Sequence, residues 1–144
     1  MGTEFQVTFD SADPGAHAAF WAEALHYVQQ PPPPGFESWD AALDAWGVPA
    51  GERNDRAALV DPGGSGPRLF FQKVPEPKTA KNRVHLDLRA AAGVPPEERT
   101  EALEAECTRL VALGAHRMQR LEADGINDVC IVMRDPEGNE FCLD

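Results

Sequence analysis

Residues 81–88 read KNRVHLDL, and the last five alternate strictly between apolar and polar side chains. Such alternation is typical of a β-strand that buries one face and exposes the other. The apolar members would face a core, while the second face would carry three groups able to do chemistry, Arg83, His85 and Asp87. We therefore predict a half-buried strand whose polar face lines a site.

The same short pattern occurs in both halves of the chain, because VTFD at residues 7–10 is repeated as VHLD at residues 84–87. A second pair of similar stretches ends each half, VDPGGSGPRLFF at residues 60–71 and MRDPEGNEFCL at residues 133–143. Repetition in a fixed order indicates two copies of one structural unit. We predict two tandem modules, residues 1–80 and residues 81–144, within a single domain that spans residues 1–144.

Helix signals lie between the repeated stretches. The dipeptide Asp13–Pro14 supplies an N-cap and a first-turn proline for a helix over residues 16–28. A second, amphipathic helix is predicted over residues 95–114, acidic in its early turns. A short inserted helix within residues 36–47, with Ser38 as its cap, follows the stiff polyproline stretch QQPPPPG. Strands are predicted at residues 4–10, 57–61, 67–74, 81–88 and 115–122, and in a hairpin over residues 128–144 that turns through Asp135–Gly138.

Each half therefore has the order β-α-β-β-β, and its one helix can cover only one face of its strands. The predicted fold class is α+β, with the two modules forming a curved mixed sheet around a central cavity and the helices on the outside. The face turned away from the helices would carry a mostly polar set of side chains from the first and last strands of each module: Gln6, Thr8, Phe70, Gln72, Arg83, His85, Asp87, Glu140 and Cys142.

The charge of the chain excludes several classes of partner. Its formal net charge is -11 over 144 residues, which disfavours nucleic acid and anionic lipid as ligands. The apolar runs are too short to cross a bilayer, and the N-terminal residues lack the pattern of a secretory signal. Three cysteines without a CxxC spacing are typical of a reduced protein. We predict a cytoplasmic protein that binds a small molecule.

Three long stretches together resemble the vicinal oxygen chelate superfamily. They are VTFDSADPGAHAAFWAEALHY, PRLFFQKVPEPKTAKNRVHLDL and MRDPEGNEFCLD, and the resemblance covers nearly the whole chain. The superfamily includes glyoxalase I, extradiol dioxygenases and bleomycin-resistance proteins, and the chain looks most like its actinobacterial glyoxalase-like domain proteins. The resemblance implies a fold of two β-α-β-β-β modules and a homodimer.

The resemblance also implies where a metal would bind. Members that use a divalent metal take four ligands from the first and last strands of the two modules, usually His or Gln, Glu, His and Glu. The matching positions in this chain are Gln6, Gln72, His85 and Cys142. Two expected carboxylates are therefore replaced, although Glu140 lies on the face of Cys142 and could complete a set with Gln6 and His85. An alternative soft pair, His85 with Cys142, would suit zinc but supplies only two ligands.

The leading hypothesis is a glyoxalase-like protein that binds a small polar or anionic metabolite between its modules, without a metal or another cofactor. If the protein is an enzyme, His85 would act as acid and base, with Asp87 orienting its ring. Arg83 would bind a carboxylate or phosphate of the ligand, unless it is a solvated strand end or pairs with Asp87. The predicted ligand-binding residues are Arg83, Gln6, Gln72, Phe70, Cys142 and Trp46, the last as part of an aromatic lid.

Two alternatives remain beside this hypothesis. One is a divalent-metal-dependent lyase, isomerase or dioxygenase of the same superfamily, with Gln6, His85 and Glu140 as ligands. The other is sequestration of a drug, as in bleomycin-resistance proteins, for which the negative charge would suit a cation.

Two further histidines lie on the first predicted helix. His17 is expected to be solvated rather than catalytic. His26 occupies the position at which helices of this family usually place a glycine, which would put a non-glycine residue in the left-handed conformation.

Overall fold

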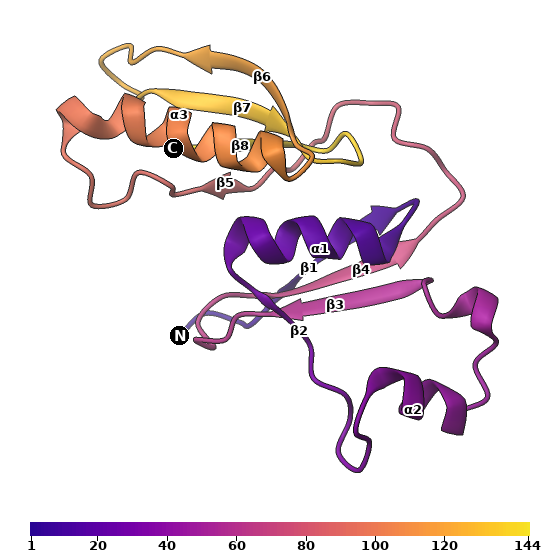
Figure 1. Cartoon of the computed structure of the whole chain (residues 1–144). Helices are drawn as coiled ribbons and strands as arrows, with labels where there is room; N and C mark the ends of the chain where they lie inside the picture. Colours follow the sequence, from indigo (N-terminus) through magenta and orange to yellow (C-terminus); the bar gives the residue numbers. More distant parts are fainter. The chain divides into compact units, whose positions relative to one another are not determined.

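The computed structural model describes all residues from 1 to 144 and divides into two compact units, Met1–Pro77 and Lys78–Asp144. The first contains β1 (Gln6–Ser11), α1 (Pro14–Leu25), β2 (Val28–Gln29), α2 (Trp39–Ala45), the 3₁₀ turn η1 (Ala50–Glu52), β3 (Arg56–Val60) and β4 (Arg68–Lys73) (Figure 1). The second contains β5 (Asp87–Leu88), the 3₁₀ turn η2 (Pro96–Glu98), α3 (Arg99–Ala112), β6 (His116–Leu121), β7 (Cys130–Arg134) and β8 (Glu140–Leu143).

The two units share one topology. Each forms a four-stranded sheet, in the order β1-β4-β3-β2 in the first unit and β5-β8-β7-β6 in the second. In both sheets the first strand pairs parallel with the last strand, and the other pairs are antiparallel. The predicted α+β class and the β-α-β-β-β repeat are therefore confirmed, with one mixed sheet in each module.

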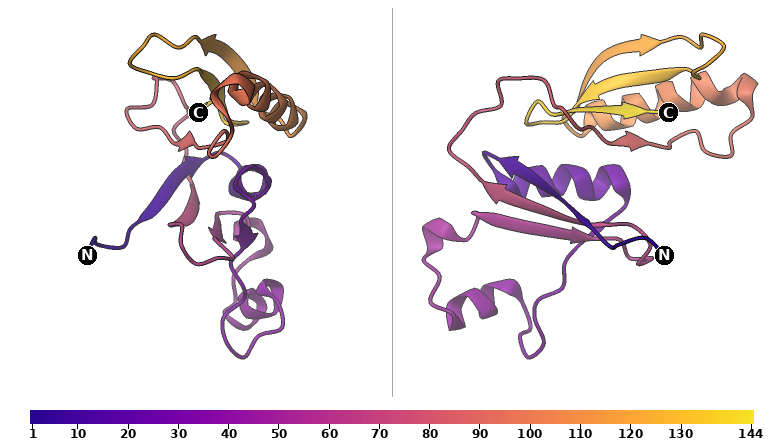
Figure 2. Two further views of the ribbon diagram at one scale, coloured as in Figure 1. Left: turned by 90° about the vertical axis from the view of Figure 1, so that its left-hand side faces the viewer. Right: turned by 180° about the vertical axis from the view of Figure 1, so that it is seen from behind.

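In the first unit, α1 lies across one face of its own sheet, as Figure 2 shows. The strands turn Leu69 and Phe71 toward this helix, and both side chains are buried. Phe71 stacks on Phe9 with ring centroids 5.0 Å apart, and α1 adds the buried ring of Trp21 at 5.3 Å from Phe9. This aromatic cluster is the core of the unit, because large buried rings contribute the most apolar area per side chain.

The expectation for His17 is wrong, because this side chain is buried in the same core. The Trp21 indole Nε1–H donates to His17 Nε2 at 3.3 Å, and His17 Nδ1 forms a short hydrogen bond with the Ser11 hydroxyl. Since Nε2 accepts, the proton of the neutral ring lies on Nδ1 and is donated to Ser11. His17 is thus a core residue that is hydrogen-bonded at both ring nitrogens.

In the second unit, α3 lies across one face of its sheet. Leu103 and Leu110 on the helix and Ile131, Met133, Phe141 and Leu143 on the strands are all buried. These residues follow the predicted periods of 3.6 on the helix and 2 on the strands.

Both ends of α1 follow the sequence signals. The Asp13 carboxylate accepts a hydrogen bond from the backbone N–H of Ala16 at 3.1 Å, so that Asp13 caps the helix. His26 ends the helix with a φ angle of 57° and is the one non-glycine residue at positive φ. The left-handed helix end is therefore formed, with a histidine where glycine would fit without strain.

The strand predicted over residues 81–88 is wrong in extent, because only Asp87–Leu88 is a strand. Val84 precedes it and is 80% exposed. The physical reason is a competing hydrogen-bond partner. The Glu140 carboxylate accepts a hydrogen bond from the backbone N–H of Asn82 at 2.9 Å, and the Lys78 ammonium lies 3.3 Å from the same carboxylate. The chain bends at this side chain and joins the sheet only further on, where Cys142 N–H donates to the Leu86 carbonyl at 3.0 Å.

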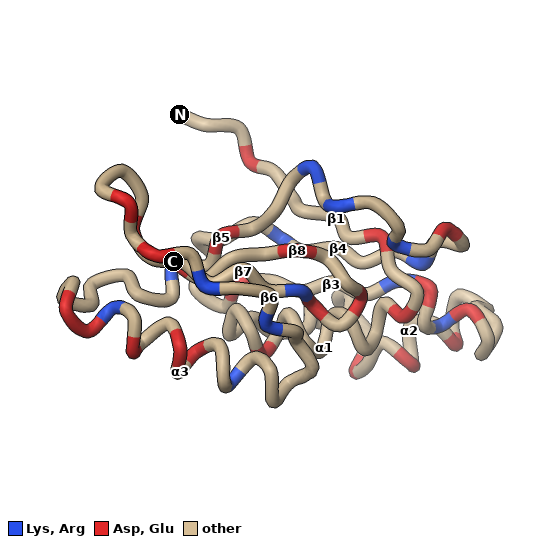
Figure 3. The backbone as a smooth tube through the Cα atoms, turned by 90° about the horizontal axis from the view of Figure 1, so that it is seen from above, with Lys and Arg blue, Asp and Glu red and all other residues tan.

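Acidic residues outnumber basic ones by 24 to 13, and Figure 3 shows them along α3 and in the loops of both units. None of the helices combines the length and the apolar character that a bilayer-spanning helix needs.

Candidate functional site

The first unit contains a pocket of about 310 Å³ on the face of its sheet that α1 leaves free. We call it the aromatic–arginine pocket. It is lined by Gln29, Gln30, Trp39, Leu43, Trp46, Val48, Glu52, Arg53, Arg56, Ala57, Ala58, Arg68 and Phe70.

The floor of this pocket comes from β3 and β4. Ala58 and Phe70 are register partners on these antiparallel strands, and Arg68 and Arg56 lie two residues away from them on the same face. The small Ala58 leaves room above the sheet that a larger side chain would fill, and the period of 2 turns the neighbouring Leu69 into the core. The free face of the sheet therefore offers an aromatic ring between two guanidinium groups.

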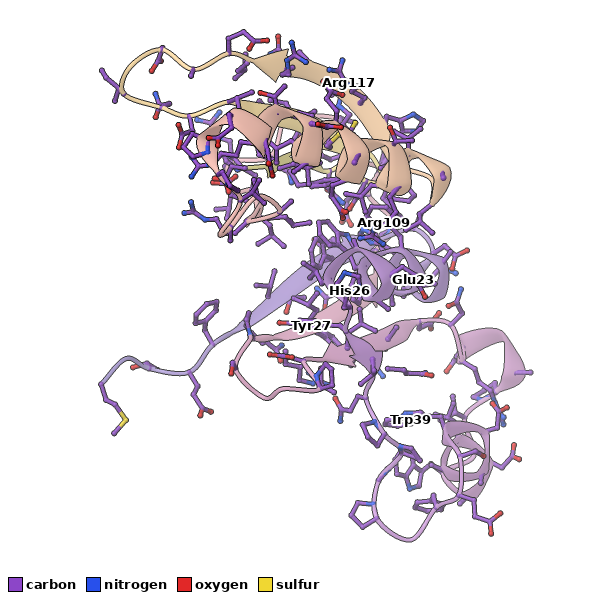
Figure 4. All side chains as sticks on the ribbon, turned by 60° about the vertical axis from the view of Figure 1, so that its left-hand side comes forward. Glu23, His26, Tyr27, Trp39, Arg109 and Arg117 are labelled. Atoms are coloured by element: carbon purple, nitrogen blue, oxygen red, sulfur yellow. The ribbon has the colours of Figure 1, made fainter.

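The roof of the pocket is α2. Ser38 caps this helix through its hydroxyl, which accepts the N–H of Ala41 at 3.0 Å. Trp39 and Trp46 stand two turns apart, with ring centroids separated by 6.5 Å. The Trp39 indole N–H donates to the Gln30 carbonyl at 2.7 Å, which ties the helix to the chain leaving β2 (Figure 4). Two tryptophans thus cover a pocket whose floor holds Phe70.

The cations of the pocket differ in how far their charge is neutralised. Arg53 pairs with the Asp44 carboxylate and donates to the Val48 carbonyl. Arg68 instead donates to two neutral amides, Gln30 Oε1 at 2.6 Å and Gln6 Oε1 at 2.9 Å, and its guanidinium carbon lies 5.3 Å from the centre of the Phe70 ring.

The side chain of Arg56, the third cation of the pocket, forms no ion pair and no hydrogen bond. Arg68 is therefore held in place without losing its charge, and Arg56 adds a second positive charge on the same floor.

The second unit contains a cluster of His85, Asp87 and Cys142, which we call the His–Asp–Cys cluster. One ligand-type atom from each residue lies within 4.8 Å of the others. His85 Nδ1 is 2.8 Å from Asp87 Oδ1, and both side chains are 42% exposed. Asp87 and Cys142 are register partners on the parallel strands β5 and β8, so the backbone ladder sets the distance between carboxylate and thiol.

The thiol of Cys142 is held in its protonated form. Burial, together with the negative charge of Asp87 and a hydrogen bond to it, raises the pKa of Cys142 from 9.0 to about 11. Burial also raises the pKa of Cys130, which lies on the neighbouring strand. A thiolate at Cys142 therefore needs a cation beside it to form at neutral pH.

Glu140 lies on β8 close to Cys142 in sequence but not in the cluster. Its carboxylate binds the Asn82 N–H, the Lys78 ammonium and, at 3.7 Å, the Arg134 guanidinium. Burial alone would raise the pKa of this carboxyl, but the hydrogen bond from Asn82 and the charge of Lys78 hold it below its usual range. Glu140 is a structural anion that fixes the bend before β5.

The structure brings together some of the residues predicted to bind a ligand and separates others. Phe70 and Trp46 line the aromatic–arginine pocket, and Gln6 positions Arg68 at its edge. Gln72 does not line it and donates to Asp10 at 2.8 Å instead. Arg83 is exposed before β5 and forms no ion pair.

Sequence reasoning missed Arg68 and Arg56, whereas Trp39 was expected beside Trp46 in the helix that could cap the pocket. Arg68 alternates with Phe70 and therefore carried the same signal of a shared face. Arg56 lay just outside the strand predicted at residues 57–61, so that no face was assigned to it.

The resemblance to metal-using proteins implies a divalent ion, and the donor atoms decide which ion fits. A hard ion such as Mn²⁺ prefers carboxylate, carbonyl and water oxygens. The His–Asp–Cys cluster offers imidazole, carboxylate and a soft sulfur, which is a donor set typical of zinc. The set Gln6, His85 and Glu140 does not fit, because Glu140 is occupied by Lys78 and Asn82 within the second unit.

Comparisons with known proteins agree with this fold. Residues 6–143 match the family described as glyoxalase-like domain. A comparison with curated proteins finds no match.

Several solved structures are similar. One is a glyoxalase/bleomycin resistance protein/dioxygenase family enzyme from Burkholderia phytofirmans PsJN, with 16% identity, 96% of this chain and 94% of that chain covered, and a TM-score of 0.60. A mutant of the fosfomycin resistance protein FosX from Listeria monocytogenes, in complex with Mn(II) and 1S,2S-dihydroxypropylphosphonic acid, has 12% identity, coverage of 99% and 89%, and a TM-score of 0.63. TioX from Micromonospora sp. ML1 has 16% identity, coverage of 99% and 97%, and a TM-score of 0.53. At these identities the similarity shows a shared fold.

Proposed function

Because the chain belongs to the glyoxalase-like domain family and the free face of its first sheet carries a pocket, we propose that it binds a small organic anion with a flat apolar part in the aromatic–arginine pocket. The observation that carries this proposal is Arg68, whose charge is positioned by Gln6 and Gln30 without a carboxylate.

The charge of the pocket differs in sign from that of the chain as a whole. The chain carries a formal net charge of -11, yet three of its 13 cations line one small pocket. A guanidinium that keeps its charge beside an aromatic ring favours a carboxylate or phosphonate, because a planar fork of N–H donors matches two anionic oxygens. Only Arg53 among the three is neutralised by an acidic partner. The pocket therefore favours an anion over a cation.

Size and shape restrict the ligand further. A volume of about 310 Å³ lies at the lower end of small-molecule pockets. Trp39, Trp46 and Phe70 offer aromatic surface to a flat apolar group, while Arg68 and Arg56 take its anionic end. The phosphonate found with FosX from Listeria monocytogenes is also a small anion, which supports this class of ligand.

A second use of the protein is suggested by His85 and Asp87. The Asp87 carboxylate accepts a hydrogen bond from His85 Nδ1. The other ring nitrogen, Nε2, is then the atom that could take or give a proton. An enzyme of this kind would use His85 as its acid and base, and Asp87 would fix the tautomer of the ring. A metal bound by the same side chains would exclude this use, so that the two are separated by a metal-binding measurement.

The binding proposal is tested with benzoate and phenylphosphonate as probes and phenethylammonium as the cation of similar size. Tryptophan emission reports binding, because two of the three tryptophans line the pocket. We expect both anions to change the emission with saturation and to raise the melting temperature. Arg68→Ala should weaken both anions by at least about tenfold, the order of one charged hydrogen bond.

Arg83→Ala is the matched control, since Arg83 is an exposed arginine outside the pocket. This variant should keep the affinity of the wild-type protein. Equal affinity in Arg68→Ala and the wild type would refute the proposal. Preferential binding of phenethylammonium would instead support sequestration of cations.

A further inference from the structure

We propose that His85, Asp87 and Cys142 form a binding site for one thiophilic divalent ion of the zinc class. This inference concerns the second unit only and does not rest on the anion-binding pocket of the first unit. Its new element is Asp87, which supplies a carboxylate from a position that the metal-using members of the superfamily do not use.

The geometry supports three ligands rather than two. The sequence offered only His85 and Cys142 as soft donors, and two ligands do not make a site. Folding adds Asp87, because β5 pairs in parallel with β8 and places this residue opposite Cys142. One donor atom of each residue then lies within 4.8 Å of the others, close enough for all three to reach one ion after small side-chain rotations.

The backbone fixes this arrangement from both sides of the cluster. Cys142 N–H donates to the Leu86 carbonyl at 3.0 Å, and Asp144 N–H donates to the Leu88 carbonyl at 2.9 Å. Hydrogen bonds to the residues before and after Asp87 thus hold its backbone against β8. His85 lies two residues before Asp87, and its ring points at the Asp87 carboxylate. Little backbone movement is needed to bring the donors onto a metal.

The kinds of donor select the ion. Imidazole, carboxylate and thiolate together match zinc sites with three protein ligands and one open position. Side-chain exposure of 42% at His85 and Asp87 leaves solvent access for a fourth ligand. Sulfur disfavours Mn²⁺ and Mg²⁺, which prefer oxygen. Two anionic ligands would also neutralise a dication locally, since no lysine or arginine of the unit pairs with Asp87.

The neighbouring polar groups do not compete for the ion. Glu140 is held by Lys78 and Asn82. Asp144 Oδ2 pairs with Arg89 at 3.4 Å, and although its buried Oδ1 has no hydrogen-bond partner, Asp144 is not part of the cluster. Cys130 lies on the neighbouring strand of the same sheet, but its sulfur is not part of the cluster. Cys130 is therefore suited as a control residue.

The experiment is a titration of the chelator-treated full chain with Co²⁺, which reports thiolate ligation through a sulfur-to-cobalt charge-transfer band in the near ultraviolet. We expect this band to saturate at one equivalent of Co²⁺ and to disappear when Zn²⁺ is added. Cys142→Ser should abolish the band, and Asp87→Asn and His85→Ala should each weaken Co²⁺ binding by at least about tenfold. Cys130→Ser should keep both the band and the affinity.

Circular dichroism of each variant checks that its fold is retained. Absence of the band in the wild type, or its persistence in Cys142→Ser, would overturn the proposal. A wild-type affinity for Mn²⁺ that equals that for Zn²⁺ would also overturn it. Benzoate binding depends on Arg68 in the first unit, and Co²⁺ binding depends on residues of the second unit. A failed Co²⁺ titration would therefore overturn the metal site without changing the result for the aromatic–arginine pocket.

Discussion

The two units of the chain have the same strand order but differ in their first strand. β1 pairs with β4 over six residues, whereas β5 pairs with β8 over two. The long pairing in the first unit gives a broad free face that α2 covers, with Arg68 and Phe70 on the floor. The short pairing in the second unit places His85 outside the strand and next to Asp87. A shared topology therefore fixes where polar groups can gather, and the length of one strand changes which chemistry gathers there.

The largest effect is expected in the two cores. Phe71 on β4 and Phe141 on β8 lie on corresponding strands and are both fully buried. Phe71→Ala and Phe141→Ala should each lower the free energy of unfolding by about 3–5 kcal/mol, because each leaves a cavity in a packed core. Chemical denaturation followed by circular dichroism measures this loss. The comparison predicts similar losses in the two units.

Phe5→Ala is the control for this pair. Phe5 precedes β1 and is 70% exposed, so its removal should change the free energy of unfolding by less than about 0.5 kcal/mol. A large loss for Phe5→Ala, or a negligible loss for one of the buried pair, would contradict the packing of that unit.

A second prediction concerns Cys142, because the first unit contains no cysteine. With a pKa of about 11, Cys142 in metal-free protein should react with iodoacetamide roughly 100-fold more slowly at pH 8 than a thiol with the ordinary value of 9.0. The rate should rise with pH until about 11, because the thiolate is the reacting form.

Asp87→Asn should accelerate alkylation of Cys142, since the charge of Asp87 contributes to its raised pKa after burial. Mass spectrometry of the modified peptide gives the rate in a background of Cys107→Ser and Cys130→Ser. A rate that levels off near pH 9, or a slower reaction in Asp87→Asn, would contradict this arrangement.

A third prediction concerns the contacts by which each helix packs on its own sheet, which are polar in the first unit and sulfur-mediated in the second. α1 packs through the polar pair of His17 and Ser11, whereas α3 packs through a contact of 3.5 Å between Cys107 Sγ and Met133 Sδ. Ser11→Ala removes the hydroxyl that binds His17 Nδ1 and should lower the free energy of unfolding by about 1–3 kcal/mol. Ser65→Ala, in an exposed turn, should have little effect. Urea denaturation compares the two variants, and equal stabilities would argue against the buried hydrogen bond.

The smallest effect is expected on the surface of the second unit. Hydrogen bonds from Arg120 and Arg117 lower the pKa of Glu104 below its ordinary value of 4.5 (Arg117 is labelled in Figure 4). Since the folded-state pKa is the lower one, this stabilisation is present above the unfolded-state pKa and is lost as the pH falls through the folded-state pKa.

Glu104→Gln should therefore lower the free energy of unfolding by less than about 1 kcal/mol at pH 7, because the group is partly exposed, and the difference should vanish at strongly acidic pH. Thermal unfolding at several pH values measures it, with the exposed Glu37→Gln as control. A difference that grows toward low pH would have the wrong sign for this ion-pair network.

The sequence predicted the repeat, both long helices and the hairpin of the second unit, because each has a strong periodic pattern with a cap or turn residue. It also indicated that the aromatic Phe70 shares a face with the polar residues Gln6 and Gln72 of the first unit. The alternation in KNRVHLDL did not predict the true length of this strand. The reason is that Glu140, which is distant in sequence, accepts a hydrogen bond from the backbone N–H of Asn82. Local periodicity does not report such a competing partner.

The candidate sites were less predictable for a related reason. Arg68 gains its role from Gln6 and Gln30, which are far from it in sequence. Asp87 becomes a neighbour of Cys142 only through the parallel register of β5 and β8. Tertiary contacts of this kind depend on strand pairing, which a single sequence does not specify residue by residue.

The segment between β2 and β3 is attached at both of its ends. At its start, the Gln30 carbonyl accepts a hydrogen bond from the Trp39 indole, and the Gln30 side chain accepts one from Arg68. The prolines at 31–34 restrict the backbone between Gln30 and Trp39. Near its end, Arg53 holds Asp44 and the Val48 carbonyl. Residues 31–52 thus form a cassette with fixed anchor points. Replacing this cassette with others of similar length offers a route to new ligand preferences while the strands beneath it stay untouched.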